Sequence, residues 1–211
     1  MNNFQENFVL ELLHAADQEG SSPAVADAPR FSAVLNGLRA QDLGDDGFDD
    51  YTLTLSSGDA FIPGVFYDAS VQAFAPADGE EALAGVGDIQ IQNELGFQAI
   101  SLGNHEFDDG TAPLAALIDG SAPGEILGAD FAGAQFPYLS ANLDFSTDAN
   151  LAPLVVPGGE APQPNSLSSS VVVDVNGEDI AVVGATTPTL ASISSPDDVT
   201  IAPADFAASP T

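Results

Sequence analysis

An alternation of apolar segments, acidic loops and helical segments before residue 120 constrains the fold of this 211-residue chain most strongly. Three apolar runs have the length and composition of buried strands, at 8–15, 51–55 and 97–102. Three further segments have helical character, at 30–41, 86–96 and 111–118. Because strands that alternate with helices pair in parallel through crossovers, the pattern predicts an α/β fold with a parallel sheet.

The rest of the chain predicts additional β-structure. Residues 137–143 are expected to form a fourth strand, and residues 144–170, rich in Pro, Gly, Ser and Asn, a long surface loop. Two apolar segments, 170–175 and 179–184, flank Asn176-Gly177, the strongest short signal for a β-hairpin. The remaining C-terminal residues are rich in Pro and predict irregular structure.

The charge of the chain excludes two classes of partner. Asp and Glu number 32 against two arginines and no lysine, which gives a net charge of −30. Nucleic acid polymers and anionic membrane surfaces both require clustered Lys and Arg, so neither is an expected partner. Multivalent cations are compatible with this charge, and a salty environment would screen its self-repulsion.

The sequence does not determine the cellular compartment of the protein. The absence of cysteine excludes disulfides and thiolate metal sites, and no apolar run is long enough to span a membrane. Residues 1–7 are polar and lack the basic region of a secretory signal. The protein is therefore exported by another route, lacks its native start in this sequence, or is cytosolic.

Three loops that follow the predicted strands carry carboxylate and amide side chains. Asp17 follows the first strand, Asp59 the second, and Asn104 lies in the segment Gly103-Asn104-His105-Glu106-Phe107-Asp108 after the third. The carboxyl ends of parallel strands meet at one edge of a sheet, so these side chains are expected to converge. Such oxygen and imidazole donors suit Mg²⁺, Mn²⁺, Ca²⁺ or Zn²⁺.

Bound cations would also explain how so acidic a chain could bind an anion. Two metal ions can lower the pKa of a water and stabilise the leaving oxygen of a phosphate ester. They would reverse the local field that otherwise repels phosphate. An EF-hand calcium loop beginning at Asp42 is not supported, because Gly44 and Leu53 occupy positions that require ligands.

The same residues also have simpler interpretations. Asp17 could cap a turn, and Gly58-Asp59 alone is a common turn sequence. Glu19 is as well explained by a solvated loop charge as by a ligand. His14, on the first strand, is interpreted as a packed or hydrogen-bonded residue, and Asn142 as a strand-end turn residue.

The motifs resemble those of calcineurin-like metallophosphoesterases of the 5′-nucleotidase branch. That family has, in order, Asp-x-His, Gly-Asp and Gly-Asn-His-Asp/Glu, and here the matching segments are Asp17-Gln18-Glu19, Gly58-Asp59 and 103–108. Segments 136–143 and 177–188 also resemble the branch. The resemblance implies a layered β-sandwich with flanking helices, of which the first half to two-thirds is expected here.

The resemblance also implies roles for individual residues. Asp17 would bind the first of two divalent metal ions, Asp59 would bridge both, and Asn104 would bind the second. His105 would stabilise the transferring phosphoryl group or protonate the leaving oxygen, oriented by Asp108. Phosphate monoesters, especially nucleotides, would be hydrolysed by metal-bound hydroxide without a covalent enzyme intermediate.

Two departures from the family pattern change these expectations. Glu19 replaces the family's histidine, which favours Mn, Mg or Ca over Zn or Fe at the first site. No histidine follows His105, whereas the family takes further ligands from later histidines. Residues 1–211 are therefore expected to be the N-terminal portion of one catalytic domain, inactive alone, with the C-terminal part and any substrate-specificity domain absent.

The sequence is thus compatible with two functions, which experiment can distinguish. The first is a metal-dependent phosphomonoesterase or nucleotidase, extracellular or periplasmic by the resemblance and the acidity. The second is a non-catalytic, acidic, cation-binding module or degenerate relative within a larger secreted protein.

Overall fold

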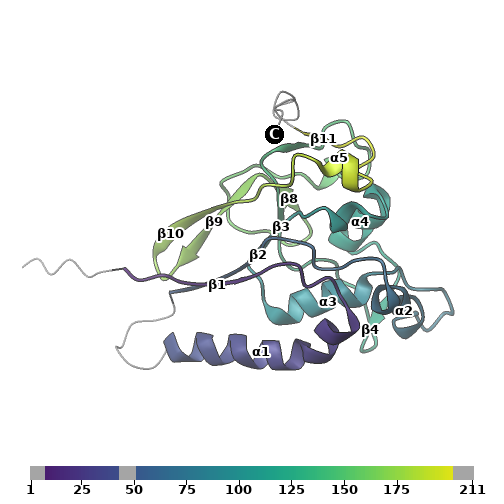
Figure 1. Ribbon diagram of the computed structural model, residues 1–211, viewed down its shortest axis with the longest axis horizontal. Coiled ribbons are helices and arrows are strands. Elements are labelled where there is room, and N and C mark those ends of the chain that lie inside the picture. Colours follow the sequence, from purple (N-terminus) through teal and green to yellow (C-terminus); the bar gives the residue numbers. More distant parts are fainter. Residues whose placement is uncertain (1–7, 43–50, 202–211) are drawn as a thin grey trace, which may run out of the picture.

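Five parallel strands form the central sheet of the computed structural model, which describes residues 8–42 and 51–201 (Figure 1). In spatial order they are β1 (Glu11–Ala15), β2 (Thr52–Ser56), β3 (Ala99–Ser101), β6 (Tyr138–Leu139) and β8 (Leu167–Ser168). The spatial order follows the order along the chain, so each new strand adds to the same side of the sheet. The mixed α/β fold with a parallel sheet is therefore confirmed.

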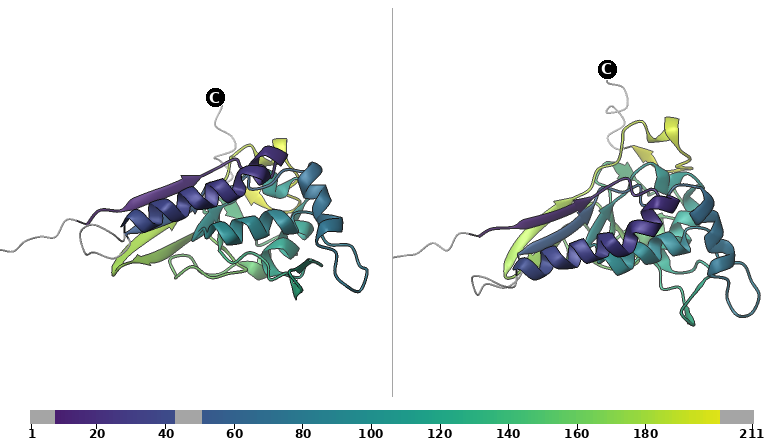
Figure 2. Two further views of the ribbon diagram at one scale, coloured as in Figure 1. Left: turned by 90° about the horizontal axis from the view of Figure 1, so that it is seen from below. Right: turned by 60° about the horizontal axis from the view of Figure 1, so that its bottom comes forward.

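The helices share one face of this sheet. The four longest are α1 (Ser22–Asp42), α2 (Val65–Ala73), α3 (Val86–Leu95) and α4 (Thr111–Asp119). Parallel crossovers are right-handed, so a sheet that grows in one direction places its helices on one side. Figures 1 and 2 show α1 and α3 lying together along that side. Helical side chains such as Ile89 and Leu117 join Ile100 and Tyr138 of the sheet in one buried cluster.

A β-hairpin covers part of the opposite face. It consists of β9 (Ser170–Val175) and β10 (Glu178–Val183), paired antiparallel as predicted around Asn176-Gly177. Val171, Val173 and Val175 pack with the sheet residues Leu53, Ala99 and Leu139. Successive strand residues point to opposite faces, so Ala99 contacts the hairpin side and Ile100 the helical side.

Short elements complete the described structure. Two small antiparallel pairs join β4 (Glu125–Ile126) to β5 (Ala129–Asp130), and β7 (Leu143–Asp144) to β11 (Thr200–Ile201). The remaining elements are the helix α5 (Leu190–Ile193) and the 3-10 helices η1 (His105–Phe107) and η2 (Ala152–Leu154).

Several boundaries differ from the sequence-based expectations. α1 begins at Ser22 rather than residue 30 and continues through Pro29. α2 was not predicted, because its β-branched and aromatic residues favour strands, yet burial of Tyr67 and Ser70 stabilises it as a helix. The expected strand 137–143 is divided into β6 and β7. The predicted surface loop 144–170 contains the buried strand β8, which is too short for a periodic pattern.

Helix α1 is fixed to the sheet and to α3 through Arg39. Its guanidinium donates to Thr54 Oγ1 at 3.0 Å and to the carbonyl oxygens of Leu95 and Gly96 at 2.9 and 3.2 Å. A cation at these last carbonyls of α3 also complements the helix dipole. No helix in the described part of the chain combines the length and the apolar character needed to cross a bilayer. Residues 43–50 of the rejected calcium loop lie outside the described residues.

Asp88, on the first turn of α3, is a buried carboxylate without a hydrogen-bond partner among the described residues. Its side chain is 2% exposed, and neither carboxylate oxygen has a partner. The carboxylate lies against Gly20, where a Cβ would overlap Asp88 Oδ1. Burial raises the pKa of Asp88 from 3.8 to about 7, although its own backbone N–H opposes the shift.

Replacing Asp88 by Asn should therefore stabilise the protein, by an amount that grows as the pH rises from about 4 to about 7. Below about pH 4 the carboxyl is protonated in the folded and unfolded states, so its burial costs no charge desolvation. As the pH rises towards 7 only the unfolded state ionises, which removes stability at roughly 1.4 kcal/mol per pKa unit. Urea denaturation should show Asp88→Asn more stable by about 2–4 kcal/mol at pH 8 and nearly equal to wild type at pH 4.

The exposed Asp78 provides the matched control, since Asp78→Asn removes the same charge from the surface. A wild-type minus Asp88→Asn difference that does not change between pH 4 and pH 8 would contradict the buried protonated carboxyl.

Candidate active site

The loops that leave β1 and β2 run side by side at the carboxyl edge of the sheet. The backbone N–H of Asp17 donates to Gly58 O at 3.2 Å, and that of Glu19 donates to Asp59 O at 2.9 Å. A third hydrogen bond, of 3.1 Å, runs from Gly20 N to the carbonyl oxygen of Ala60. This ladder fixes the backbone of the first predicted motif beside that of the second.

Two glycines allow the loop after β3 to approach equally closely. A Cβ on Gly58, whose φ is +97°, would overlap the backbone at Ser101 and Gly103. A Cβ on Gly103 would overlap the carboxylate of Asp59. The glycines of the second and third motifs therefore have a packing role, which brings Asp59 against the third loop.

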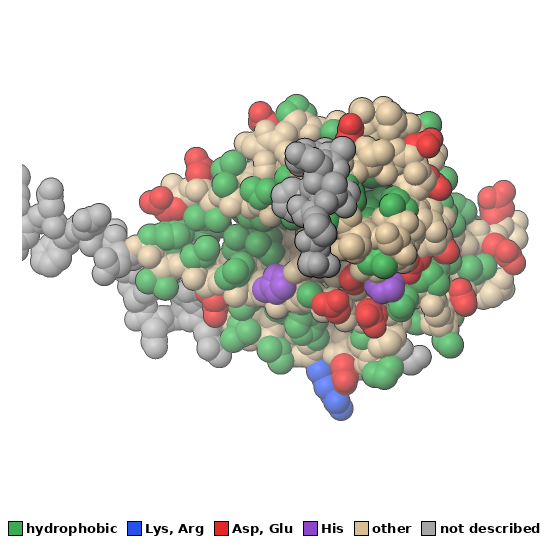
Figure 3. Space-filling model, turned by 45° about the horizontal axis from the view of Figure 1, so that its top comes forward, with side chains coloured by type: hydrophobic (Ala, Val, Ile, Leu, Met, Phe, Trp, Pro, Cys, Tyr) green, Lys and Arg blue, Asp and Glu red, His purple; other side chains and the backbone are tan. Residues whose placement is uncertain are grey.

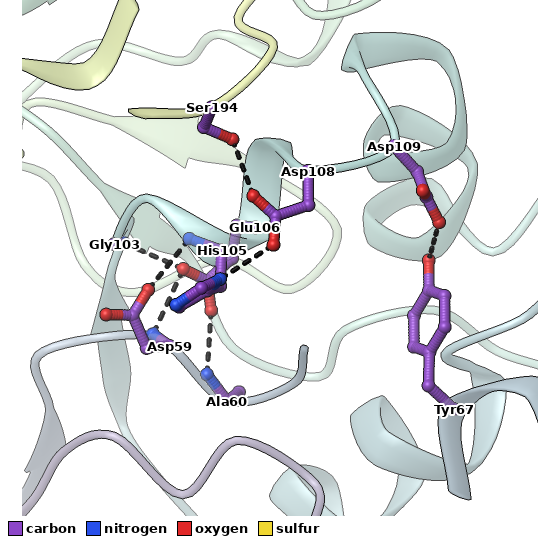
Figure 4. A network of polar contacts seen from close by, with 9 residues as sticks. All are labelled: Asp59, Ala60, Tyr67, Gly103, His105, Glu106, Asp108, Asp109 and Ser194. Atoms are coloured by element: carbon purple, nitrogen blue, oxygen red, sulfur yellow. Dashed lines mark hydrogen bonds and ion pairs between the residues drawn. The ribbon is translucent and has the colours of Figure 1, made fainter. Parts of the chain in front are cut away.

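Glu106 joins the loops after β2 and β3 through a buried carboxylate. Its Oε2 accepts from Gly103 N at 2.8 Å and Asp59 N at 3.0 Å, and its Oε1 accepts from Ala60 N at 2.9 Å (Figure 4). Burial raises the pKa of Glu106 to about 7, while the three backbone donors oppose that shift. The sequence motif contained Glu106 but gave it no role. The sequence does not reveal that the Glu106 side chain is buried, and its role depends on that burial.

His105 is held by a carboxylate three residues away. Its Nδ1 lies 2.6 Å from Asp108 Oδ2, and Asp108 Oδ1 accepts from Ser194 Oγ at 2.8 Å. A carboxylate only accepts hydrogen bonds, so Nδ1 carries the proton and Nε2 remains for the site. Sequence reasoning paired Asp108 with His105 but missed Ser194, which lies 86 residues further along the chain.

The surroundings of His105 favour its charged form. Burial lowers the pKa of the imidazole, but the hydrogen bond and the charge of Asp108 outweigh this effect. The negative charges of Asp59 and Glu19 act in the same direction. The pKa of His105 is therefore raised above its ordinary value of 6.5.

Three of the predicted ligands adopt left-handed backbone conformations. The φ angles are 51° for Asp17, 52° for Glu19 and 53° for Asp59. Such conformations cost about 1 kcal/mol or more for a residue with a Cβ and concentrate at functional sites. The loops thus maintain strained conformations at the positions where the motifs place metal ligands.

The candidate ligand atoms lack competing partners. Among the described residues, the side chains of Asp17, Glu19 and Asn104 make no hydrogen bond or ion pair, and Asp59 uses only Oδ1, to accept from His105 N at 2.8 Å. Acidic and histidine side chains gather on the corresponding face (Figure 3).

Neither arginine makes a contact at this edge. Arg30 pairs with Asp27, and Arg39 binds Thr54 and the end of α3. Hard oxygen donors that have no protein cation beside them fit a divalent cation.

The side chains are gathered in one region without forming a closed metal cage. Within residues 8–42 and 51–201, no three His, Asp or Glu side chains are close enough together to hold a metal ion. The structure thus brings together His105, Asp108 and Asp59, with Glu19 near enough to influence the pKa of His105. Asp17 is joined to them through its backbone bond to Gly58.

Two residues outside the predicted site have hydrogen-bonding surroundings. His14 Nε2 lies 2.6 Å from Ser57 Oγ. Asn142 accepts from Thr186 N and donates to Thr186 O, both at 2.8 Å, so its amide fastens a strand end to the segment after β10. Both environments agree with the structural interpretation of these residues.

Comparison with known proteins finds similarity to nucleotide phosphoesterases and 5′-nucleotidases. No protein-family model matches the chain. It is 27% identical over 196 residues to the trifunctional nucleotide phosphoesterase protein YfkN of Bacillus subtilis, covering 89% of this chain and 12% of that protein. It is 38% identical over 101 residues to a 5′-nucleotidase of Diplobatis ommata, covering 46% of this chain and 14% of that protein.

A solved structure supports the same resemblance. The 5′-nucleotidase precursor from Thermus thermophilus superposes with a TM-score of 0.63 and 25% identity over 95% of this chain and 33% of that one. The chain thus spans 12–14% of these curated relatives and a third of the solved one. The resemblance to the 5′-nucleotidase branch is confirmed, and it corresponds to a part of those proteins.

Replacing Glu106 by Gln should separate the loops after β2 and β3. The amide NH₂ would face at least one backbone N–H that now donates to the carboxylate, leaving buried donors unpaired. At pH 8 the relief of burying a neutral side chain opposes this cost, and we expect a net loss of stability in urea denaturation because three backbone donors depend on the carboxylate. Amide hydrogen exchange should also accelerate at Asp59, Ala60 and Gly103.

The exposed Glu80 supplies the control, since Glu80→Gln removes the same charge away from the site. Unchanged exchange at the three amides in Glu106→Gln would show that Glu106 does not hold these loops together.

Proposed function

We propose, from the confirmed resemblance to 5′-nucleotidases, that this chain contributes to metal-dependent hydrolysis of phosphate monoesters, with nucleotides as the substrate class. The observation that carries the proposal is that hydrogen bonds hold the loops of Asp17 and Asp59 beside the His105–Asp108 pair at one edge of the sheet. Nucleotide phosphoesterase and 5′-nucleotidase are the names of the relatives that match this chain.

The oxygen donors divide into two proposed metal positions. Asp17, with Glu19 beside it, would bind the first divalent cation, Asp59 would be shared by both, and Asn104 would bind the second. When bound, such cations supply Lewis acidity and a water of lowered pKa. With carboxylate and amide donors only, Mn²⁺, Mg²⁺ or Ca²⁺ is a better match than Zn²⁺ at the first position.

His105 is proposed to act on the phosphoryl group directly. The hydrogen bond and the charge of Asp108 raise the pKa of His105, and the bond to Nδ1 leaves Nε2 available to the site. From that atom His105 can donate a hydrogen bond to a phosphoryl oxygen or a proton to the leaving oxygen. Asp108 is assigned the orientation of the ring.

An extracellular or periplasmic location is part of the proposal. It follows from the resemblance together with the charge of −30, which is more tolerable where salt screens it. A small phosphate ester, rather than a nucleic acid polymer, is the proposed substrate because the chain has only two arginines and no lysine.

Metal binding and turnover should respond differently to two substitutions. Asp59→Asn removes the shared carboxylate and should abolish Mn²⁺ binding in calorimetry as well as turnover. His105→Asn should retain the metal and, in a chain extended to a complete catalytic domain, slow hydrolysis by roughly 10²–10⁴-fold. High potassium chloride and Asp78→Asn, an exposed loop variant, control for diffuse binding of cations to the acidic surface.

Equal loss of metal in both variants would overturn the role assigned to His105. Mn²⁺ binding that requires Asp59 but never supports hydrolysis would instead favour the non-catalytic cation-binding module.

Residues 1–211 alone should hydrolyse phosphate esters slowly or not at all. The chain has no histidine after His105, so the second metal position has no imidazole ligand from later residues. Purified chain and p-nitrophenyl phosphate, with Mn²⁺ present, provide the assay. Rapid turnover that Asp59→Asn abolishes would show that the described donors suffice for catalysis.

A further inference from the structure

Ser194 contacts the far side of the carboxylate that holds His105. Its hydroxyl donates to Asp108 Oδ1 at 2.8 Å, while Asp108 Oδ2 accepts from His105 Nδ1 at 2.6 Å (Figure 4). Each oxygen of this carboxylate therefore has its own donor, which fixes rotation of the carboxylate plane. Ser194 is half-buried and Asp108 is 21% exposed, so solvent competes only partly for these bonds.

The segment that carries Ser194 is anchored to the same loop on both sides of Asp108. On one side, Ser195 N donates to Phe107 O at 3.3 Å. On the other, Asp197 Oδ2 accepts from Thr111 N at 2.8 Å and from Thr111 Oγ1 at 3.0 Å.

The fit of this segment is close and specific. Pro196, between the two anchors, is buried. A Cβ added to Gly110 would lie 2.9 Å from Asp197 Oδ2, so the segment packs directly on the turn that leads into α4. These contacts join residues more than 80 positions apart. The η1 segment could not form them without residues 194–197.

We propose that Ser194 is a positioning residue for the catalytic pair, and that residues 194–197 hold the His105 loop in its active geometry. This inference rests on the proposed function of His105. The hydroxyl of Ser194 sets the orientation of Asp108, and Asp108 sets the ring plane and the tautomer of His105. In this proposal Ser194 acts through Asp108 and not on the substrate or a metal ion.

Nuclear magnetic resonance of the imidazole tests the proposal without requiring activity. The chain has two histidines, so His14 serves as an internal reference in the same spectrum. In Ser194→Ala, the His105 Nδ1 proton should exchange faster with water and shift upfield, because its acceptor can rotate. Ser194→Thr, which keeps the hydroxyl, should restore the wild-type signal.

Kinetics in a catalytically complete chain provide the second measurement. Ser194→Ala should lower kcat by roughly 10-fold with little change in KM or metal content. Ser195→Ala is the matched control, since that side chain is exposed and makes no hydrogen bond among the described residues. If wild type itself has no turnover the proposed function fails, whereas the Nδ1 proton still decides the role of Ser194.

Either of two results would overturn the inference. One is an Nδ1 proton in Ser194→Ala that exchanges and resonates as in wild type. The other is a change of the same size in Ser195→Ala, which would reduce the effect to general loosening of the segment.

Discussion

The structure of the candidate site depends on one buried carboxylate that three backbone N–H groups of two loops share. Glu106 receives these bonds from Asp59, Ala60 and Gly103, so the loops after β2 and β3 cannot separate without exposing unpaired donors. The loop after β1 then follows the loop after β2 through backbone bonds alone. The scaffold groups thus satisfy one another, and among the described residues the side chains of Asp17, Glu19 and Asn104 and one oxygen of Asp59 are left without hydrogen-bond partners.

The direction of growth of the sheet explains why the site lies where it does. Strands added in one direction place the helices on a single face, and every parallel strand ends at the same edge. The edge therefore collects a loop from each strand, and short side chains with left-handed backbone angles fit where those loops crowd. The same crowding accounts for Gly58 and Gly103, where a Cβ would overlap the neighbouring loop.

The sequence was sufficient for features that depend on local pattern. The hairpin at Asn176-Gly177 and the helix beginning at Val86 follow from neighbouring residues. The pairing of His105 with Asp108 was implied by the family resemblance, and the structure contains it. Features that depend on distant partners were missed. α2 is helical because of tertiary burial, β8 is too short to leave a pattern, and Ser194 meets Asp108 only through the folded chain. The motifs define residue types rather than distances, so the metal positions are proposals. Among the described residues, no three carboxylate or imidazole groups lie close enough together to bind one metal ion.

The distribution of positive groups bears on the proposed dependence on cations. An anion at this edge would need hydrogen-bond donors, yet carboxylates of the protein already occupy the obvious backbone N–H groups. Glu106 takes three of them, and Asp59 takes that of His105. Arg30 and Arg39 make their contacts elsewhere. Of the groups described at this edge, His105 Nε2 and the side-chain amide of Asn104 are then donors that the protein itself can offer to a phosphate. In the proposed function, bound cations would supply the remaining positive charge.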